Sequence, residues 1–261
     1  MLTLTQGHLR QLEICPRRYQ YGYLEQIPIP IDPAMLERQR WGTQFHLVMQ
    51  QRELGLPIEG FLEQDKALSA AVDGLLTAAP ELFSPQVNGF RQSEHRRTFT
   101  FNGYALTAIY DLLVLQPRRG RVIDWKTYQQ HPNQAQLTQE WQTRLYLYLL
   151  VETTDLTPAQ VSMTYWFVAP PAAQTALEPP SSITIAHSAA QHRRTEADLQ
   201  RLTNRLTALL ASGSDLPQID PALGCCAQCP YAVRCQRWNE RFAADEGMAL
   251  PAIADITEVP L

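Results

Sequence analysis

Three stretches in the middle of the chain combine apolar, β-branched and aromatic residues in short runs. They cover residues 96–101, 104–115 and 121–125, and this composition is typical of strands. The dipeptide Asn102-Gly103 separates the first two and is a strong signal for a two-residue hairpin turn. The pattern therefore predicts three consecutive antiparallel strands.

Helical segments are predicted on both sides of these strands. The first helix begins after Thr5, which serves as its N-cap, and Pro16 interrupts it. Further helices are predicted at residues 35–53, 65–78, 134–150 and 189–211.

Two more strands are predicted, at residues 161–168 and near Ile183. A proline-rich loop is expected at residues 27–33, and a loop-like segment that ends in a weakly ordered tail is expected from Gly213 onward. This order of elements predicts an α/β (α+β) fold, in which helices surround a central mixed sheet.

Length and composition are compatible with one large domain at residues 1–261. Hydrophobic residues make up 45% and charged residues 18% of the chain, which argues against disorder. No apolar run approaches the ~18 residues of a membrane span. The N-terminus lacks the basic and apolar regions of a signal peptide. We therefore expect a cytoplasmic, reducing location and no membrane partner.

The net charge of −4 gives no support for a nucleic-acid partner. Such a partner would need a local basic patch. Arginines do cluster locally, although an ordinary solvated surface is the alternative explanation for each cluster. The clusters are Arg17/Arg18, Arg38/Arg40, Arg96/Arg97 and Arg118/Arg119/Arg121.

Asp124 and Lys126 lie two residues apart in the sequence R-V-I-D-W-K. On a strand this spacing places both side chains on one face. A carboxylate can bind Mg²⁺ or Mn²⁺ through oxygen. A neighbouring lysine can orient water or stabilise charge on a phosphate. The short pattern is common by chance, so its surroundings must decide between a structural and a catalytic role.

Asp111 is a lone carboxylate inside the apolar run Y-A-L-T-A-I-Y-D-L-L-V-L. An unpaired charge buried there would cost several kcal/mol, so a metal or a cationic partner is expected. A turn separates Asp111 from Asp124, and adjacent antiparallel strands can bring the two carboxylates together. The alternative is an exposed edge position that faces water.

Three further residues belong to predicted helices. His46, in W-G-T-Q-F-H, is a suitable ligand for metals such as Mn²⁺, although a lone histidine is more often structural. Gln142 and Tyr146 are four residues apart and share one helical face. The alternative is a core tyrosine and a surface amide.

The order G-T-x-x-H, I-Y-D, D-W-K and Q-x-x-x-Y resembles the PD-(D/E)XK nuclease superfamily. It is most similar to the RecB-like branch, which includes CRISPR-associated and helicase-fused exonucleases. The resemblance implies a restriction-endonuclease-like sheet and a catalytic centre that binds Mg²⁺ or Mn²⁺. The implied ligands are His46, Asp111, Asp124 and the backbone carbonyl of Trp125, with Lys126 catalytic and Gln142 and Tyr146 near the DNA.

This resemblance implies a divalent-metal-dependent DNA nuclease. An exonuclease that prefers single-stranded ends is expected, in repair, recombination or CRISPR-type processing. A separate helicase or a CRISPR integration protein is the expected protein partner. Two rivals remain: a non-catalytic or partner-activated DNA-binding subunit, and a binding protein with a zinc-ribbon tail.

The five cysteines form a second candidate centre. Cys226, Cys229 and Cys235 follow a C-x2-C-x5-C pattern, and Cys15 stands alone near the N-terminus. Four thiolates suit either Zn²⁺ or a [4Fe–4S] cluster, and a reducing location disfavours disulfides. Cys225 is left over and could replace Cys226, although the spacing favours Cys226.

The same resemblance favours iron–sulfur over zinc. It implies a cluster held by Cys15, Cys226, Cys229 and Cys235, with a structural role. The cluster would tie residues from about 1–25 to residues from about 213–240 as a clasp on the nuclease domain.

Overall fold

The computed structural model describes residues 1–29, 32–83, 89–127, 132–168 and 179–237. Contacts divide the chain into two compact units. The first, called here the sheet unit, comprises Met1–Arg10 and Pro30–Thr207. The second, the cysteine unit, comprises Gln11–Ile29 and Ala208–Leu261. The predicted loop at residues 27–33 lies partly, and the predicted tail beyond residue 237 wholly, outside the described residues.

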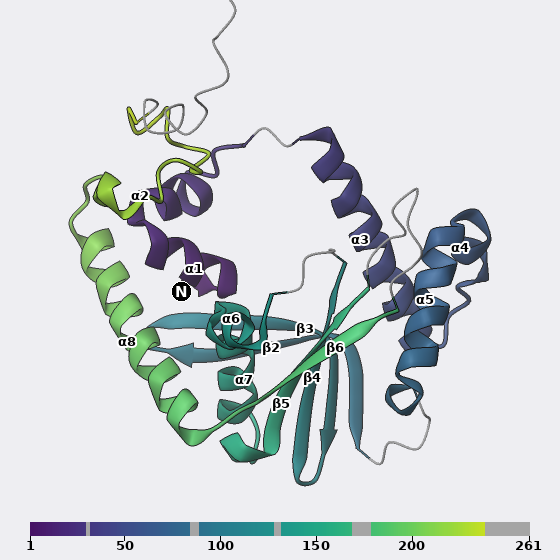
Figure 1. Cartoon of the computed structure of the whole chain (residues 1–261). Coiled ribbons are helices and arrows are strands. Elements are labelled where there is room, and N and C mark those ends of the chain that lie inside the picture. The colour runs from purple at the N-terminus through teal and green to yellow at the C-terminus, as the bar shows by residue number, and fades with distance from the viewer. Residues whose placement is uncertain (30–31, 84–88, 128–131, 169–178, 238–261) are drawn as a thin grey trace, which may run out of the picture. The chain divides into compact units, whose positions relative to one another are not determined.

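A six-stranded mixed sheet forms the centre of the sheet unit (Figure 1). The strand order is β1-β3-β4-β5-β6, and β2 pairs with β3. The β2–β3, β3–β4 and β5–β6 pairs are antiparallel, whereas β1–β3 and β4–β5 are parallel. The strands are β1 (Thr3–Leu4), β2 (Phe90–Phe101), β3 (Tyr104–Gln116), β4 (Arg119–Lys126), β5 (Val161–Phe167) and β6 (Ser181–Ala186).

The predicted hairpin turn joins β2 to β3. Asn102 and Gly103 have φ angles of 48° and 82°, so both adopt the left-handed backbone that a type I′ turn requires. Phe101 pairs with Tyr104 across the turn. The three predicted antiparallel strands and their order are therefore confirmed, as is the central mixed sheet.

The sheet is forked along one edge of β3. Strand β2 pairs with β3 from Tyr104 to Leu115 and so occupies one edge of β3. Strands β1, at Ala105–Leu106, and β4, at Leu112–Gln116, must therefore share the other edge. Within the described residues, no strand pairs with residues 107–111 on that edge. Asp111 lies at the point where β4 departs.

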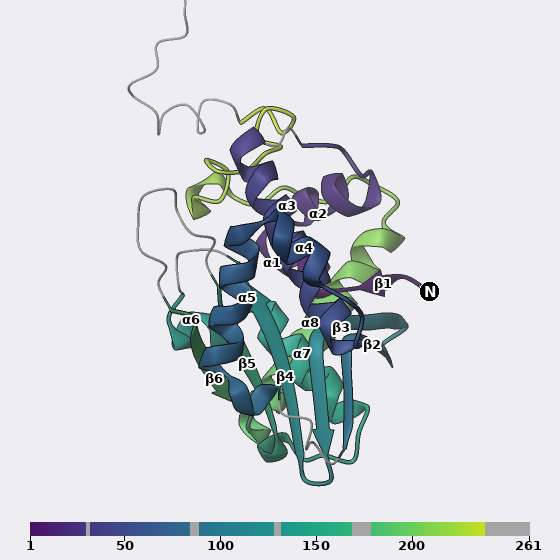
Figure 2. The same cartoon turned by 90° about the vertical axis from the view of Figure 1, so that its right-hand side faces the viewer.

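Helices cover both faces of the sheet (Figures 1 and 2). One face carries α3 (Pro33–Glu53), α4 (Glu59–Gln64) and α5 (Lys66–Ala78). Their apolar side chains pack in one core cluster with Leu112, Ile123 and Trp125 of the sheet. Asp65 caps α5 by accepting hydrogen bonds from the Ala67 and Leu68 amides at 2.9 and 3.0 Å. The helices predicted at residues 35–53 and 65–78 are thus confirmed.

The opposite face carries α6 (Gln134–Gln139), α7 (Trp141–Glu152) and α8 (Ala189–Ala211). The single helix predicted at residues 134–150 was wrong, because Glu140 has an extended backbone (ψ 138°) that separates α6 from α7. The Thr143 hydroxyl donates to the Leu137 carbonyl at 2.6 Å, which also accepts from the Glu140 amide at 3.2 Å at the end of α6. The break buries both Leu137 and Trp141.

The cysteine unit is built around a helix interruption. Helix α1 (Gln6–Ile14) ends before Cys15, and α2 (Pro16–Tyr19) follows, as predicted from Pro16. A π-helix (Gln20–Leu24) continues the segment. Short 3₁₀ helices, which the sequence did not predict, occur at Pro80–Leu82, Pro158–Gln160 and Pro221–Leu223.

The two segments of the cysteine unit contact each other directly (Figure 1, purple and yellow). The Arg17 guanidinium donates to the Asp215 carboxylate at 2.7 Å and also to the Leu216 carbonyl. The Tyr231 hydroxyl donates to the Ile27 carbonyl at 3.1 Å. None of the helices in the described ranges combines the length and apolar character that a membrane crossing requires.

Candidate active site

The fork in the sheet orients Asp111. Beyond the last β3–β4 pair, Leu112 with Ile123, the next ladder position would hold Asp111 and Asp124. Here the Trp125 amide donates instead to Asp111 Oδ2 at 2.8 Å. The carboxylate thus satisfies a backbone donor that the separating strands leave free. The expected proximity of Asp111 to the D-W-K segment is confirmed.

Asp124, Lys126 and Gln142 form a closed triangle of polar contacts. The Lys126 ammonium lies 2.6 Å from Asp124 Oδ2. It also donates to Gln142 Oε1 at 2.8 Å, while Gln142 Nε2 donates to Asp124 Oδ1 at 2.5 Å. Asp124 and Lys126 therefore share one face, as predicted. Gln142 fixes the position of both, because its amide combines an acceptor oxygen with a donor nitrogen.

Asp124 is almost completely buried, with an exposed fraction of 2%. Burial raises the pKa of its carboxyl well above the usual range, and the Asp111 charge raises it further, while Lys126 and His46 oppose the shift. Lys126 lies at ion-pair distance from Oδ2, but within the described chain no donor meets this oxygen with hydrogen-bond geometry. A buried carboxylate with unused acceptor capacity is suited to a cation.

Helix α3 brings His46 to the site through a close approach at Gly42. A Cβ atom added at Gly42 would lie 2.6 Å from the Thr127 hydroxyl oxygen, just beyond the end of β4. Only glycine lets the helix pack this closely. His46 lies one turn further along the same helix, so the G-T-x-x-H pattern combines a packing residue with a candidate ligand.

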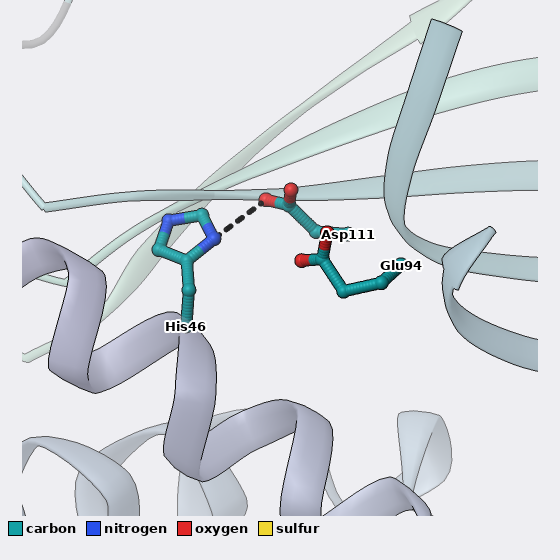
Figure 3. Close-up of side chains that lie close together, drawn as sticks. All are labelled: His46, Glu94 and Asp111. Carbon is teal, nitrogen blue, oxygen red and sulfur yellow. Dashed lines mark ion pairs between the residues drawn. The ribbon is translucent and has the colours of Figure 1, made fainter. Parts of the chain in front are cut away.

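His46 Nδ1 lies 3.4 Å from Asp111 Oδ2 (Figure 3). Burial by itself lowers the pKa of this histidine, but Asp111, Asp124 and Glu94 together raise it above its ordinary value. The site is thus rich in negative charge. Of the three predicted side-chain ligands, His46 of α3 and Asp111 of β3 lie together. Asp124 of β4 influences the pKa of His46, but its carboxylate contacts Lys126 and Gln142 and is not part of the group of adjacent ligand atoms.

Glu94 of β2 is a member of the site that the sequence did not reveal. One ligand atom each from His46, Glu94 and Asp111 lie within 4.8 Å of one another (Figure 3). Partial burial and the Asp111 charge raise the pKa of Glu94, while His46 opposes the shift. A glutamate in a polar strand sequence, Q-S-E-H, gave no signal, because its role depends on the partner strand.

Tyr146 lies one helical turn after Gln142 on α7, on the buried side of the site. It is buried, and Gln142 and the Ile109 backbone lie close enough to its hydroxyl to lower its pKa. Burial, followed by the charges of Asp124 and Asp111, raises its pKa. These contacts favour a positioning role for Tyr146, acting through Gln142. The shared helical face of the two residues is confirmed.

The Trp125 carbonyl was a predicted metal ligand. The Val168 amide donates to the Lys126 carbonyl at 2.8 Å, so that carbonyl points toward β5. Carbonyls alternate in direction along a strand, so the Trp125 carbonyl is expected on the β3 side, together with its amide. This direction fits the prediction. Imidazole nitrogen, carboxylate oxygens and a backbone carbonyl are suitable ligands for Mg²⁺ or Mn²⁺.

The arginine clusters divide into structural and exposed members. Arg17 contacts Asp215, and Arg97 donates to the Thr153 carbonyl at 2.8 Å, so both have structural partners. Arg38 and Arg40 are exposed on α3, the helix that carries His46. Arg52, on the same helix, lies 3.8 Å from the Glu53 carboxylate instead.

The cysteine unit holds all five cysteines around one cavity. Cys15, Cys225, Cys226, Cys229 and Cys235 line it together with Arg18, Arg237 and apolar side chains, and all five are free thiols. Burial, followed by the neighbouring Cys229 and Cys15, raises the pKa of Cys235. Arg237 donates to Cys226 Sγ at 3.1 Å. The distant Cys15 is thus brought to the C-terminal cysteines.

Comparison with known proteins gives one family match and two distant structural matches. The family model of the PD-(D/E)XK nuclease superfamily matches residues 3–236. The crystal structure of SSO0001 has a TM-score of 0.39 and 14% identity, and the match covers 88% of this chain and 84% of that one. A protein of Eubacterium rectale proposed to be an exonuclease has a TM-score of 0.46 and 10% identity, with coverage of 77% and 79%. No curated protein matches the sequence at a significant level.

Proposed function

The chain belongs to the PD-(D/E)XK nuclease superfamily, and on this premise we propose that it is a divalent-metal-dependent DNA nuclease of the RecB-like type. It hydrolyses phosphodiester bonds and acts as an exonuclease on single-stranded ends. The observation that carries this proposal is the convergence of His46, Asp111, Asp124 and Lys126 at the fork of the sheet.

His46, Asp111, Asp124 and the Trp125 carbonyl would hold the divalent ion. When bound, such an ion lowers the pKa of a water molecule and neutralises charge on the phosphate. Lys126 orients the attacking water and stabilises the charge that develops on the phosphate oxygens. Gln142 fixes the Lys126 and Asp124 side chains relative to each other. Tyr146 keeps the Gln142 side chain in place.

The DNA strand is held through its phosphates. Arg38 and Arg40 are the proposed contacts on α3, since both are exposed there. Phosphate contacts position a strand without reading its bases, so we expect little sequence preference. The net charge of −4 implies modest affinity and strong salt sensitivity.

The cysteine unit is proposed to hold a [4Fe–4S] cluster through Cys15, Cys226, Cys229 and Cys235. The shared cavity, the free thiols and the N–H donor from Arg237 to Cys226 support this proposal. The cluster would clasp the two chain segments onto a single nuclease domain. Iron and acid-labile sulfide in anaerobically purified protein would support the cluster. A colourless protein that contains zinc would contradict it and indicate a zinc site.

Digestion of end-labelled DNA tests the nuclease proposal. Single- and double-stranded substrates are incubated with Mn²⁺, Mg²⁺ or EDTA, and the wild type is compared with Lys126→Ala. Lys66→Ala is the matched control, because Lys66 is the other of the chain's two lysines and is exposed at the start of α5. Metal-dependent cleavage that is lost only in Lys126→Ala is expected.

No cleavage by cluster-loaded wild type, on either substrate, would contradict a free-standing nuclease. It would favour a non-catalytic or partner-activated DNA-binding subunit that keeps the fold. A separate helicase or a CRISPR integration protein is the proposed activating partner. Cleavage that appears when this partner is added would identify a partner-activated subunit.

A further inference from the structure

Glu94 has a backbone conformation that is costly for its residue type. Its φ angle is +48°, in the left-handed region that glycine and asparagine occupy more readily. The residue lies inside the twelve-residue strand β2, away from either end. Because such strain persists only where the surroundings impose it, it often marks a functional position.

The strain occurs opposite Asp111. Ser93 pairs with Leu112 and His95 with Tyr110, which places Glu94 across from Asp111. The pairing has the same register on both sides of this point, so the distortion inserts no extra residue. The strand changes face at this point: Arg91 contacts Glu53 of α3, whereas Arg97, which has the same place in the alternation, contacts Thr153 at the end of α7.

The carboxylate of the exposed Glu94 reaches the proposed catalytic centre. Its oxygen lies within 4.8 Å of ligand atoms of both His46 and Asp111. Figure 3 shows the three side chains converging from α3, β2 and β3. Placing two carboxylates this close costs free energy through charge repulsion, unless a cation lies between them. The buried Asp124 adds a third carboxylate nearby, whose Oδ2 lies 2.6 Å from the Lys126 ammonium.

We propose that Glu94 is an additional ligand of a divalent cation, held together with His46 and Asp111. This inference deepens the proposed nuclease function and rests on it for the role of the cation. With a neutral imidazole, the two carboxylates carry a net charge of −2, which one divalent ion balances. The mixture of nitrogen and oxygen donors suits Mn²⁺ better than Mg²⁺, which prefers oxygen alone.

Calorimetric titration with Mn²⁺, without nucleic acid, tests Glu94 directly. Glu94→Gln keeps the length of the side chain and the backbone strain but removes the charge, and we expect Mn²⁺ affinity to fall by about 10-fold or more. Glu63→Gln is the matched control, since Glu63 is exposed on α4, and it should bind as the wild type does. Asp111→Asn is the positive control for loss of binding.

Glu94→Gly distinguishes the effect of the carboxylate on cation binding from the effect of the backbone strain on stability. Glycine relieves the left-handed strain, so the metal-free protein should unfold at a higher temperature than the wild type. Its Mn²⁺ affinity should fall as in Glu94→Gln. A purely structural glutamate would show neither the higher unfolding temperature nor the weaker binding.

The outcomes for Glu94 and for the nuclease are distinguishable. Wild-type affinity in Glu94→Gln, with binding lost in Asp111→Asn, would overturn the role of Glu94 and leave the nuclease proposal intact. Weakened Mn²⁺ binding in Glu94→Gln, with no DNA cleavage by the wild type, would support Glu94 as a cation ligand and contradict the nuclease proposal. A wild type that binds no Mn²⁺ would overturn both.

Discussion

At the scale of single residues, Asp124 shows how opposing effects set the chemistry of the site. Burial and the Asp111 charge both disfavour its ionised form, whereas Lys126 favours it. The ionisation of a carboxyl group in this balance is strongly favoured by any further positive charge nearby. Gln142 keeps the balance in place, because it binds Asp124 and Lys126 at the same time.

Replacing Gln142 should therefore impair catalysis more than cation binding. Gln142→Ala leaves Asp124 Oδ1 and the Lys126 ammonium each without one partner. We expect the cleavage rate to fall by about 10- to 100-fold, as for other groups that orient metal ligands, with Mn²⁺ affinity changing much less. Gln139→Ala, at an exposed position of α6, is the control. Equal losses in the two variants would argue against the positioning role.

His187 gives the sheet unit a pH-dependent stability. Burial, followed by the neighbouring His192, lowers its pKa to about 4. The unfolded chain binds a proton near pH 6.5 but the folded chain does not. Stability is therefore complete above about pH 6.5 and decreases as the pH falls toward about 4.

Urea unfolding at about pH 7 and about pH 5 measures this effect. The wild type should lose more stability between the two values than His187→Asn, because the variant lacks the titrating group. Identical losses would show that other groups govern the acid sensitivity.

At the scale of elements, the close packing of α3 against the end of β4 decides where His46 lies. Gly42→Ala would place a methyl group 2.6 Å from the Thr127 hydroxyl oxygen. Either the helix or Thr127 must then move, and His46 moves with the helix. We expect a loss of about 10-fold or more in cleavage, since catalytic geometry tolerates displacements well below 1 Å.

The control for this variant is Gly60→Ala on α4. An added Cβ there meets nothing within 4 Å, and alanine is the better helix former. It should leave activity unchanged and slightly raise the unfolding temperature. Unchanged activity in Gly42→Ala would mean that the contact with Thr127 relaxes without moving His46.

Elements with a strong local signal were predictable, and those set by distant partners were not. Helix α8 and the β2–β3 hairpin follow from their own sequence patterns. The break at Glu140 has neither proline nor glycine to announce it, and it accompanies the burial of Leu137 and Trp141 against distant parts of the chain. The two-residue strand β1 depends entirely on pairing with Ala105 and Leu106 of β3.

The candidate site divides in the same way. His46, Asp111, Asp124 and Lys126 could be proposed because short motifs carry them. Glu94 could not, since only the register between β2 and β3 brings it to Asp111.

At the scale of the whole molecule, the two units differ in what holds them together. The sheet unit has a large apolar core. The described part of the cysteine unit buries fewer apolar and aromatic side chains, among them Leu12, Tyr19 and Leu216. Its ion pairs, such as Arg17 with the exposed Asp215, contribute little. The proposed cluster would then supply most of its stability, as metal centres do in other small folds.

Cys15→Ser should therefore remove one part of the thermal unfolding profile. We expect loss of the visible cluster absorption and of the cysteine-unit transition, while the main transition of the sheet unit stays in place. Cys225→Ser is the control and should retain the cluster. Loss of the cluster in Cys225→Ser, with retention in Cys15→Ser, would contradict the proposed set of four thiolates.

The fork in the sheet also affects the order of folding. Strands β2, β3 and β4 are neighbours in sequence and can pair early, whereas β1 must close a loop of about 100 residues to reach β3. Until then, Ala105 and Leu106 add to the segment T-A-I-Y, which no described strand covers on this edge, so the whole apolar stretch is open to other nascent chains. The next residue, Asp111, places a charge at the end of that edge, so a residue proposed for catalysis also acts as a gatekeeper against aggregation.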